Sequence, residues 1–324
     1  MTRPLRVALV GLGVMGKNHA RVLQELDGVE LVAVVDPSVD LGRHYRPDLI
    51  MADVEDAIRA GIDYAVVAAP TELHLDLGVK LAAHGIAFLI EKPVASSVAE
   101  GKALLRSVEK AGVIAGVGHI ERFNPAIVQM RERVLRGEIG ELYQIVTRRQ
   151  GPFPDRVRDV GVVLDLASHD LHLTSWIADS EYERIHAETL YKAGRQHEDL
   201  VSITARLKSG VVVSHLVNWL TPFKERTVIV TGSRGALIAD TLSADLTLVE
   251  NPLHGTDWEA FAAFRGVAEG NRTTYAIERR EPLRLEHEDF RDAVLSGSPP
   301  GVTLKEGLAV VEVAERVLLA ASTA

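Results

Sequence analysis

Residues 5–16 read Leu-Arg-Val-Ala-Leu-Val-Gly-Leu-Gly-Val-Met-Gly, an apolar run that leads directly into a glycine-rich turn. The run predicts a buried parallel strand, and the pattern from Val14 to Leu26 predicts a helix. In such a turn the first glycine permits a tight bend, the second lets backbone approach a pyrophosphate, and the third lets helix and strand pack closely. Unpaired N–H groups at the helix start favour an anion. The stretch therefore predicts a dinucleotide-binding strand–turn–helix unit.

An acidic residue ends the next predicted strand. Asp36 follows Val29–Val35 and lies twenty residues after Gly16. A carboxylate there accepts hydrogen bonds from ribose hydroxyls and repels a 2′-phosphate, and no arginine follows in residues 37–39, so we expect NAD rather than NADP. The alternative is a glycine-rich turn in another kind of α/β protein. The residues expected to bind the dinucleotide here are Gly11, Gly13, Val14, Met15, Gly16 and Asp36.

Strand and helix patterns alternate up to about residue 120, and the strands are nearly continuous apolar runs. This succession predicts an α/β fold in which residues 1–120 form a Rossmann domain with a doubly wound parallel sheet. The predicted strands are Leu5–Val10, Val29–Val35, Asp63–Ala69, Ile86–Ile90 and Val113–Val117. The predicted helices are Val14–Leu26, Val54–Ala60, Glu72–His84 and Ser97–Ala111.

After residue 120 the pattern changes to a series of strands with few helices between them. We expect residues 121–324 to form an α/β domain with an open, mostly antiparallel or mixed sheet, used for substrate binding and oligomerisation. Its last helices are candidates to pack back toward the first domain. The predicted strands are Glu141–Arg149, Val201–Leu207, Val211–Trp219, Thr227–Thr231 and Leu246–Glu250. The predicted helices are Pro125–Leu135, Gly161–Ala178, Glu286–Leu295 and Thr303–Ala320.

Composition excludes several classes of function. A chain of 324 residues is longer than one core usually serves, which agrees with two domains. The net charge of −9 argues against nucleic-acid and anionic-membrane partners. The absence of cysteine removes disulfides, thiolate catalysis and iron–sulfur clusters. Because no signal peptide or membrane-spanning apolar run is evident, we expect a cytoplasmic protein.

The predicted strand at residues 86–90 ends abruptly in Glu91-Lys92-Pro93. A lysine at the exit of a parallel strand lies at the sheet edge where α/β folds bind ligands, and its charge there requires a function or a partner. The alternative is a solvated loop lysine beside a strand-ending proline. The preceding strand reaches the same edge, where His74 could instead be an exposed residue at a helix start. The expected nicotinamide-side residues are Ala69, Pro70, Thr71, His74, Glu91 and Lys92.

A second set of polar residues follows helical spacing. Asp165, His169 and His172 lie at i, i+4 and i+7 of the predicted helix Gly161–Ala178 and would share one face. A carboxylate one turn before an imidazole can hold its tautomer, which suits a general base. A solvated polar face and a metal site are the alternatives. A metal fits poorly beside a nicotinamide and a lysine, and we expect none.

These motifs resemble one family in their order and spacing. Gly11-x-Gly-x-x-Gly16-x-x-His19, Pro70-Thr71-x-x-His74, Glu91-Lys92-Pro93 and Asp165-x-x-x-His169 are similar to those of the glucose–fructose oxidoreductase / inositol dehydrogenase (Gfo/Idh/MocA) family. The resemblance implies a nicotinamide-dependent oxidoreductase acting on a sugar or cyclitol hydroxyl. It also implies that Lys92 and His169 are the reactive pair, that Asp165 orients His169, and that the Lys92–Pro93 bond is cis.

Three further stretches resemble the branch that oxidises C3 of UDP-N-acetylglucosamine or its uronate: residues 119–125, 151–154 and 159–165. A diphosphate could be held by the arginines at 148, 149, 156 and 158, which could equally be solvated. Many sugar and cyclitol members carry an acid three residues after the catalytic histidine, where this chain has His172, so inositol or glucose specificity does not transfer directly. The candidate substrate-binding residues are Arg122, Asn124, Arg156 and His172.

The sequence thus predicts reversible oxidation of a secondary sugar hydroxyl by NAD. His169, or Lys92 in its neutral form, would take the hydroxyl proton. The best candidate substrate is a UDP-N-acetylhexosamine or its uronate, oxidised at C3. The alternatives are an inositol or free aldose dehydrogenase, glycoside elimination or hydrolysis through a transient ketone, and a non-catalytic NAD sensor. An open sheet face predicts a homodimer or homotetramer.

Overall fold

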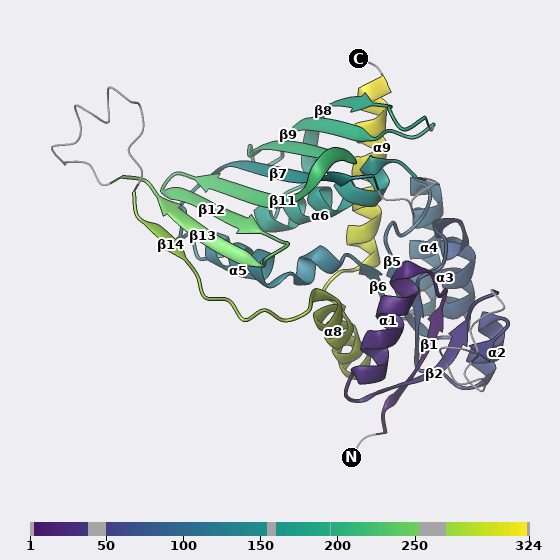
Figure 1. The fold of residues 1–324 in the computed structure, drawn as a ribbon. Helices are drawn as coiled ribbons and strands as arrows, with labels where there is room; N and C mark the ends of the chain where they lie inside the picture. Colours follow the sequence, from purple (N-terminus) through teal and green to yellow (C-terminus); the bar gives the residue numbers. More distant parts are fainter. Residues whose placement is uncertain (1–2, 38–49, 154–159, 195, 253–269, 323–324) are drawn as a thin grey trace, which may run out of the picture. The chain divides into compact units, whose positions relative to one another are not determined.

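The computed structural model describes residues 3–37, 50–153, 160–194, 196–252 and 270–322 (Figure 1). The chain divides into two compact units: Met1–Phe123 with Glu281–Glu315, and Asn124–Arg280 with Arg316–Ala324. The sequence-based division placed a boundary near residue 120 and assigned the C-terminal helices to the second domain. In the structure, most of this helical segment is grouped with the first unit.

The first unit contains a six-stranded parallel sheet with the strand order β3-β2-β1-β4-β5-β6. This order is the doubly wound arrangement of dinucleotide-binding domains, so the predicted Rossmann sheet is confirmed. The short strand β3 was not among the predicted strands. The strands are β1 (Leu5–Val10), β2 (Val29–Val35), β3 (Ile50–Met51), β4 (Tyr64–Val67), β5 (Ala87–Glu91) and β6 (Ala115–Gly118). The helical elements are α1 (Val14–Glu25), α2 (Val54–Arg59), η3 (Thr71–Leu73), α3 (His74–Ala83), α4 (Val98–Ala111), η4 (Ile120–Phe123), α8 (Pro282–Ser296) and α9 (Leu304–Ser322), whose last residues belong to the second unit.

Alternate residues of the parallel strands enter two separate cores. Phe88 and Ile90 of β5 belong to a cluster that also contains Leu104 of α4. The intervening Leu89 belongs to a second cluster with Phe290 of α8. Full burial of one such side chain stabilises the fold by about 1.5–3 kcal/mol. The C-terminal helix α8 therefore completes the core of a sheet whose strands all lie within residues 5–118.

Local sequence signals fix the helix that follows the Glu91-Lys92-Pro93 turn. The Ser97 hydroxyl accepts a hydrogen bond from the Glu100 N–H at 3.3 Å, and the Glu100 carboxylate accepts one from the Ser96 N–H at 3.0 Å. These bonds satisfy backbone donors at the start of α4. The helix ends at Gly112, whose φ of +67° is easily adopted only by glycine.

The second unit contains an eight-stranded sheet with the order β14-β13-β12-β11-β7-β10-β9-β8. Strands β7 and β10 pair in parallel and the other neighbours pair antiparallel, so the predicted mixed sheet is confirmed. Sequence patterns missed β8, β12 and the short β14. The strands are β7 (Leu142–Pro152), β8 (Tyr182–Leu190), β9 (Leu200–Leu207), β10 (Val212–Asn218), β11 (Leu220–Gly232), β12 (Gly235–Asp240), β13 (Asp245–Glu250) and β14 (Arg272–Thr274).

Helices α5 (Pro125–Leu135) and α6 (Ser168–Ala178) cover one face of this sheet (Figure 1). The residues that point to that face are buried, including Ile145, Val213 and Val228. The opposite face carries half-buried apolar residues on adjacent strands: Ile229 pairs with Val146 on one side and with Ile238 on the other. In the described ranges, no helix is both long enough and apolar enough to cross a bilayer.

Candidate active site

The three glycines of the turn have different physical roles. A Cβ on Gly11 (φ +91°) would lie 2.6 Å from the Ala68 oxygen, and one on Gly16 would lie 2.1 Å from the Gly11 oxygen. A Cβ on Gly13 would meet no described atom within 4 Å. Gly13 also begins α1 without a side-chain cap. Gly11 and Gly16 are therefore required for packing, whereas Gly13 leaves open space beside a helix N-terminus, as a pyrophosphate requires.

Asp36 is tied to the same turn. One of its carboxylate oxygens accepts a hydrogen bond from the Leu12 N–H at 2.6 Å. This bond joins the end of β2 to the glycine turn and leaves the side chain half-buried. The residues present thus fit a bound dinucleotide, with the turn holding the diphosphate and Asp36 as the candidate ribose partner.

His74 connects the ends of two parallel strands. Its Nδ1 lies 3.0 Å from the Pro93 carbonyl oxygen and its Nε2 lies 3.0 Å from the Ala69 carbonyl oxygen. Burial lowers the pKa of His74, and the hydrogen bonds to the two carbonyls and the charge of Glu91 act in the opposite direction. The alternative of an exposed helix-start histidine is wrong, because the side chain is 1% exposed. His74 therefore holds the backbone at Ala69 and the backbone at Pro93 in fixed positions relative to each other.

Strand β5 ends at Glu91, and the Lys92–Pro93 peptide bond is cis, as the resemblance implied. The Glu91 carboxylate accepts hydrogen bonds from the Lys92 N–H at 3.0 Å and is 2.9 Å from His19 Nε2. Burial alone would raise the pKa of Glu91, but the bond and charge of His19 and the charge and N–H of Lys92 hold it below its usual value. An ionised carboxylate therefore lies next to the half-buried Lys92.

The helix of the second constellation does not have regular α-helical geometry. A π-helical turn covers Val163–Ala167, and α6 begins only at Ser168. Asp165 lies in the π-turn and His169 in the α-helix, so the prediction of one continuous α-helix over residues 161–178 is wrong, and the pairing of Asp165 with His169 stays a prediction. Asp165 and His172 are buried and His169 is half-buried. π-Turns occur frequently at functional sites.

The start of this helix is anchored by a residue that the sequence patterns did not indicate. The Glu198 carboxylate accepts a hydrogen bond from the Val163 N–H at 2.9 Å, and the Glu198 carbonyl accepts one from the Val162 N–H at 3.0 Å. A Cβ on Gly161 would lie 2.0 Å from the Glu198 carboxylate. Glu198 lies 35 residues after Val163 and belongs to no spaced motif, so only the folded chain reveals its role.

A buried ion pair holds the other end of the same segment. Arg149 Nε of β7 donates to the Asp170 carboxylate of α6 at 2.9 Å, and both side chains are at most 4% exposed. The proposed arginine cluster is therefore wrong for Arg149, which is buried against Asp170. Arg148 is exposed and lies 3.8 Å from Glu225. Arg156 and Arg158 lie outside the described residues. The Arg149–Asp170 pair holds α6 against β7. It therefore also determines the position of His169, which precedes Asp170 in the chain.

Two of the candidate substrate-binding residues have structural partners. Arg122 Nη1 donates to Glu306 at 2.7 Å in the first unit. The Asn124 side chain accepts from the Ala126 N–H at 3.1 Å at the start of α5 and donates to the Thr241 carbonyl at 2.9 Å. Arg156, the third candidate, is outside the described residues. Contact of any of these residues with substrate stays a prediction.

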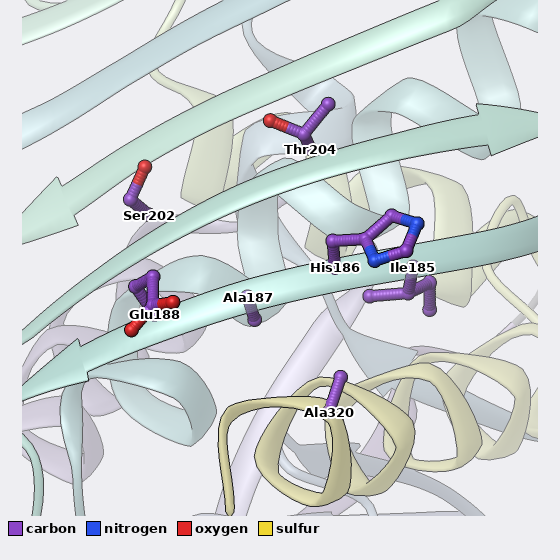
Figure 2. Close-up of a pocket in the computed structure, with 7 residues that line it drawn as sticks. All are labelled: Ile185, His186, Ala187, Glu188, Ser202, Thr204 and Ala320. Atoms are coloured by element: carbon purple, nitrogen blue, oxygen red, sulfur yellow. The ribbon is translucent and has the colours of Figure 1, made fainter. Parts of the chain in front are cut away.

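A surface recess in the second unit contains none of the predicted site residues. It lies at the edge strand β8 and has a cavity volume of about 290 Å³ (Figure 2). Its lining residues are Ile185, His186, Ala187, Glu188, Ser202, Thr204 and Ala320. Across the described ranges, no three His, Asp or Glu side chains are grouped as metal ligands.

Comparison with known proteins assigns the class of the chain. A model of an oxidoreductase family with an NAD-binding Rossmann fold matches residues 5–119, and a model of the GFO/IDH/MocA C-terminal domain matches residues 127–238. The chain is thus an NAD-binding oxidoreductase, and the predicted cofactor is confirmed. It belongs to the Gfo/Idh/MocA family.

Several characterised proteins are similar to the chain. The scyllo-inositol 2-dehydrogenase (NAD(+)) of Bacillus subtilis (strain 168) is 32% identical over 56% of each chain. The myo-inositol 2-dehydrogenase of Thermotoga maritima is 28% identical over 94% of this chain and 92% of its own. A solved UDP-N-acetylglucosamine 3-dehydrogenase from Acidithiobacillus ferrooxidans shares the fold, with a TM-score of 0.87 and 22% identity over 99% of both chains.

Proposed function

We propose that the protein oxidises a secondary hydroxyl of a sugar or cyclitol with NAD, the leading candidate being C3 of a UDP-N-acetylhexosamine or its uronate. The observation that carries the proposal is the arrangement of the first unit, where one sheet bears the open glycine turn, Asp36 and a lysine flanked by an ionised carboxylate. Relatives named as inositol and UDP-N-acetylglucosamine dehydrogenases support this substrate class.

The chemistry assigned to the chain is proton handling. Bound NAD supplies the hydride acceptor. His169, or Lys92 in its neutral form, accepts the hydroxyl proton as the C–H bond breaks. Whichever of the two side chains is not the base donates a hydrogen bond to the substrate oxygen. Asp165 is the proposed orienting partner of His169. General base catalysis of this kind contributes on the order of 10²–10⁴ in rate.

The decisive experiment incubates the protein with NAD and a panel of substrates, and follows the absorbance of NADH. The panel contains UDP-N-acetylglucosamine, its uronate, myo- and scyllo-inositol and free aldoses. A keto-acid acceptor is added in a parallel series to regenerate any cofactor that remains bound. Turnover of a UDP-sugar supports the leading candidate, and turnover of an inositol alone contradicts it. Consumption of substrate without net NADH would indicate elimination through a transient ketone.

Removal of either proposed proton acceptor tests the roles of the residues. Lys92→Ala and His169→Ala should each lower kcat by about 10²-fold or more, because the acid–base contribution is lost. Their Kd for NAD, measured by fluorescence titration, should change much less. Lys208→Ala is a matched control, since it removes an exposed cation of the second unit that has no proposed role in binding. Full turnover by both variants would contradict the assignment.

We also propose that the protein forms a homodimer or homotetramer through the open face of the eight-stranded sheet. The row formed by Val146, Ile229 and Ile238 is half-buried and apolar on three adjacent strands. Burial of such a face against a second copy is a common solution for an open sheet.

A further inference from the structure

A chain of buried titratable groups leads from Lys92 into the first unit. His19 Nε2 lies 2.9 Å from the Glu91 carboxylate, and His19 Nδ1 lies 2.8 Å from His287 Nε2. The two imidazoles are 0% exposed and Glu91 is 8% exposed. The groups come from α1, β5 and α8, and the two histidines are 268 residues apart in sequence. Folding therefore assembles a carboxylate–imidazole–imidazole chain whose outer end is the Lys92 N–H.

The hydrogen-bonding atoms define the order of the chain. The ionised Glu91 is an acceptor, so His19 Nε2 must carry the proton between them. One further proton lies between His19 Nδ1 and His287 Nε2. Burial, and then the charge of His19, lower the pKa of His287 well below its usual value, so His287 is neutral at pH 7. His19, held by His287, thus presents a fixed N–H donor to the buried Glu91 carboxylate.

The charges around this chain identify Glu91 as the carboxylate that carries charge next to Lys92. Glu286, also on α8, is 1% exposed. Burial, and then the charges of Glu91 and Asp289, raise the pKa of Glu286 well above its usual value, which favours its neutral form. Burial raises the pKa of Asp289, and the Gly301 N–H and the charge of Arg122 on η4 act in the opposite direction. On β6, a Cβ on Gly118 would lie 3.1 Å from the Glu91 carboxylate carbon, so glycine leaves the room that Glu91 occupies.

We propose that His19 and His287 are positioning residues for Lys92, acting through Glu91. The donor supplied by His19 keeps Glu91 ionised in a buried position. Glu91 then holds the Lys92 N–H and keeps a negative charge beside the lysine. The role rests on the proposed catalytic function of Lys92. A purely structural joint between α1, β5 and α8 could be apolar and would avoid the desolvation of three polar groups.

The test follows the titration of Lys92 itself by NMR of protein labelled with [ε-¹³C]lysine, with the signal assigned from Lys92→Arg. Glu91→Gln should move the midpoint of the Lys92 titration to lower pH, because the ammonium loses the negative charge of Glu91. His19→Leu should produce a similar shift, since Glu91 without its donor takes up a proton. His19→Gln keeps an N–H donor and should restore most of the midpoint. His287→Leu should shift it less.

His215→Leu is the matched control, because it removes an equally buried, doubly hydrogen-bonded imidazole from the second unit. It should lower Tm without moving the Lys92 midpoint. An unmoved midpoint in Glu91→Gln overturns the proposal, even if His19→Leu does not fold. Equal midpoints for His19→Leu and His19→Gln overturn it as well.

The titration requires neither substrate nor NAD, so the two proposals fail separately. If the protein oxidises no sugar but shows the shift, the positioning role of the two histidines is supported and the proposed function is contradicted. If the protein oxidises a sugar but the midpoint does not move in Glu91→Gln, the proposed function is supported and the positioning role of the two histidines is contradicted.

Discussion

The contacts of an individual residue indicate whether it is required for packing or is available to bind a ligand. Gly11 and Gly16 are enclosed by backbone, whereas Gly13 faces open space. His74, His215 and Glu91 are titratable but buried, and each has hydrogen-bond partners that fix its position. Substitutions at this scale therefore have distinguishable effects on stability and on ligand binding.

Gly13→Ala should fold like the original protein, because its φ of −64° suits alanine and the new Cβ meets no described atom. Its Kd for NAD should rise about tenfold or more, equivalent to about 1.4 kcal/mol, since the methyl group occupies the path of the pyrophosphate. Isothermal titration calorimetry and thermal unfolding measure the two effects. Gly16→Ala is the control and should lower Tm. Unchanged NAD affinity in Gly13→Ala would contradict the role of this glycine.

The buried His215 predicts a loss of stability in acid. It lies between the hydroxyls of Thr147 (2.7 Å) and Tyr182 (2.9 Å). Burial, and then the positive charge of Arg149, lower the pKa of His215 to about 3. The ordinary value in the unfolded chain is about 6.5, so below this pH the unfolded state binds a proton that the folded state does not. The stabilisation is complete above about pH 6.5 and decreases as the pH falls toward 3.

Between pH 6.5 and 5 the loss attributable to His215 should be about 2 kcal/mol. Urea denaturation at pH 7 and pH 5 measures it as the difference between the original protein and His215→Leu. The variant should be less stable at pH 7, because two buried hydroxyls lose a partner, but less sensitive to acid. His186→Leu, at an exposed position of β8, controls for the loss of a histidine. Equal acid sensitivity of the original protein and His215→Leu would show that His215 does not cause the loss.

Single elements are positioned by polar contacts as much as by apolar packing. The segment with Asp165 and His169 is held at its start by Glu198 and farther along by the Arg149–Asp170 pair. The π-turn between these anchors accommodates one extra residue relative to a regular helix. The two anchors therefore determine where His169 lies in the second unit.

Asp170→Asn should lower the free energy of unfolding by about 3–5 kcal/mol, because it removes the buried carboxylate that pairs with the Arg149 guanidinium. The double variant Arg149→Met/Asp170→Leu should lose less than the single variant, since no charge remains buried. Urea denaturation gives both values. Asp245→Asn, which breaks the exposed pair with Arg279, should leave stability nearly unchanged. A double variant less stable than Asp170→Asn would contradict this explanation.

At the scale of the whole molecule, the chain forms one Rossmann unit and one mixed-sheet unit, and it returns to the first unit with α8 and most of α9. Within the described residues of the second unit, helices α5 and α6 lie on one face of the sheet and leave the other face open (Figure 1). This face is the proposed contact between copies of the chain.

Ile229→Lys should dissociate the oligomer, because it places a charge in the centre of the apolar row on the open face. Size-exclusion chromatography with light scattering measures the mass of the particle. Val79→Lys changes an exposed apolar residue on α3 of the first unit and should leave the mass unchanged. A monomeric original protein, or an unchanged mass in Ile229→Lys, would overturn the proposed interface.

The sequence by itself determined the Rossmann sheet, the glycine turn with Asp36, and the strand that ends at Glu91-Lys92-Pro93. These features follow from apolar runs and from residue types with strong local preferences, such as glycine and proline. The predicted strands Val201–Leu207 and Val211–Trp219 are also present, as the antiparallel neighbours β9 and β10.

Only the tertiary structure decided which polar residues meet. The chain from Glu91 through His19 to His287, the anchoring of Val163 by Glu198, the Arg149–Asp170 pair and the π-turn leave no periodic signal in the sequence. Each joins segments that are distant in the chain or replaces regular helical geometry locally. Their physical basis is the requirement that buried polar groups find partners, and that requirement is met in space rather than along the chain.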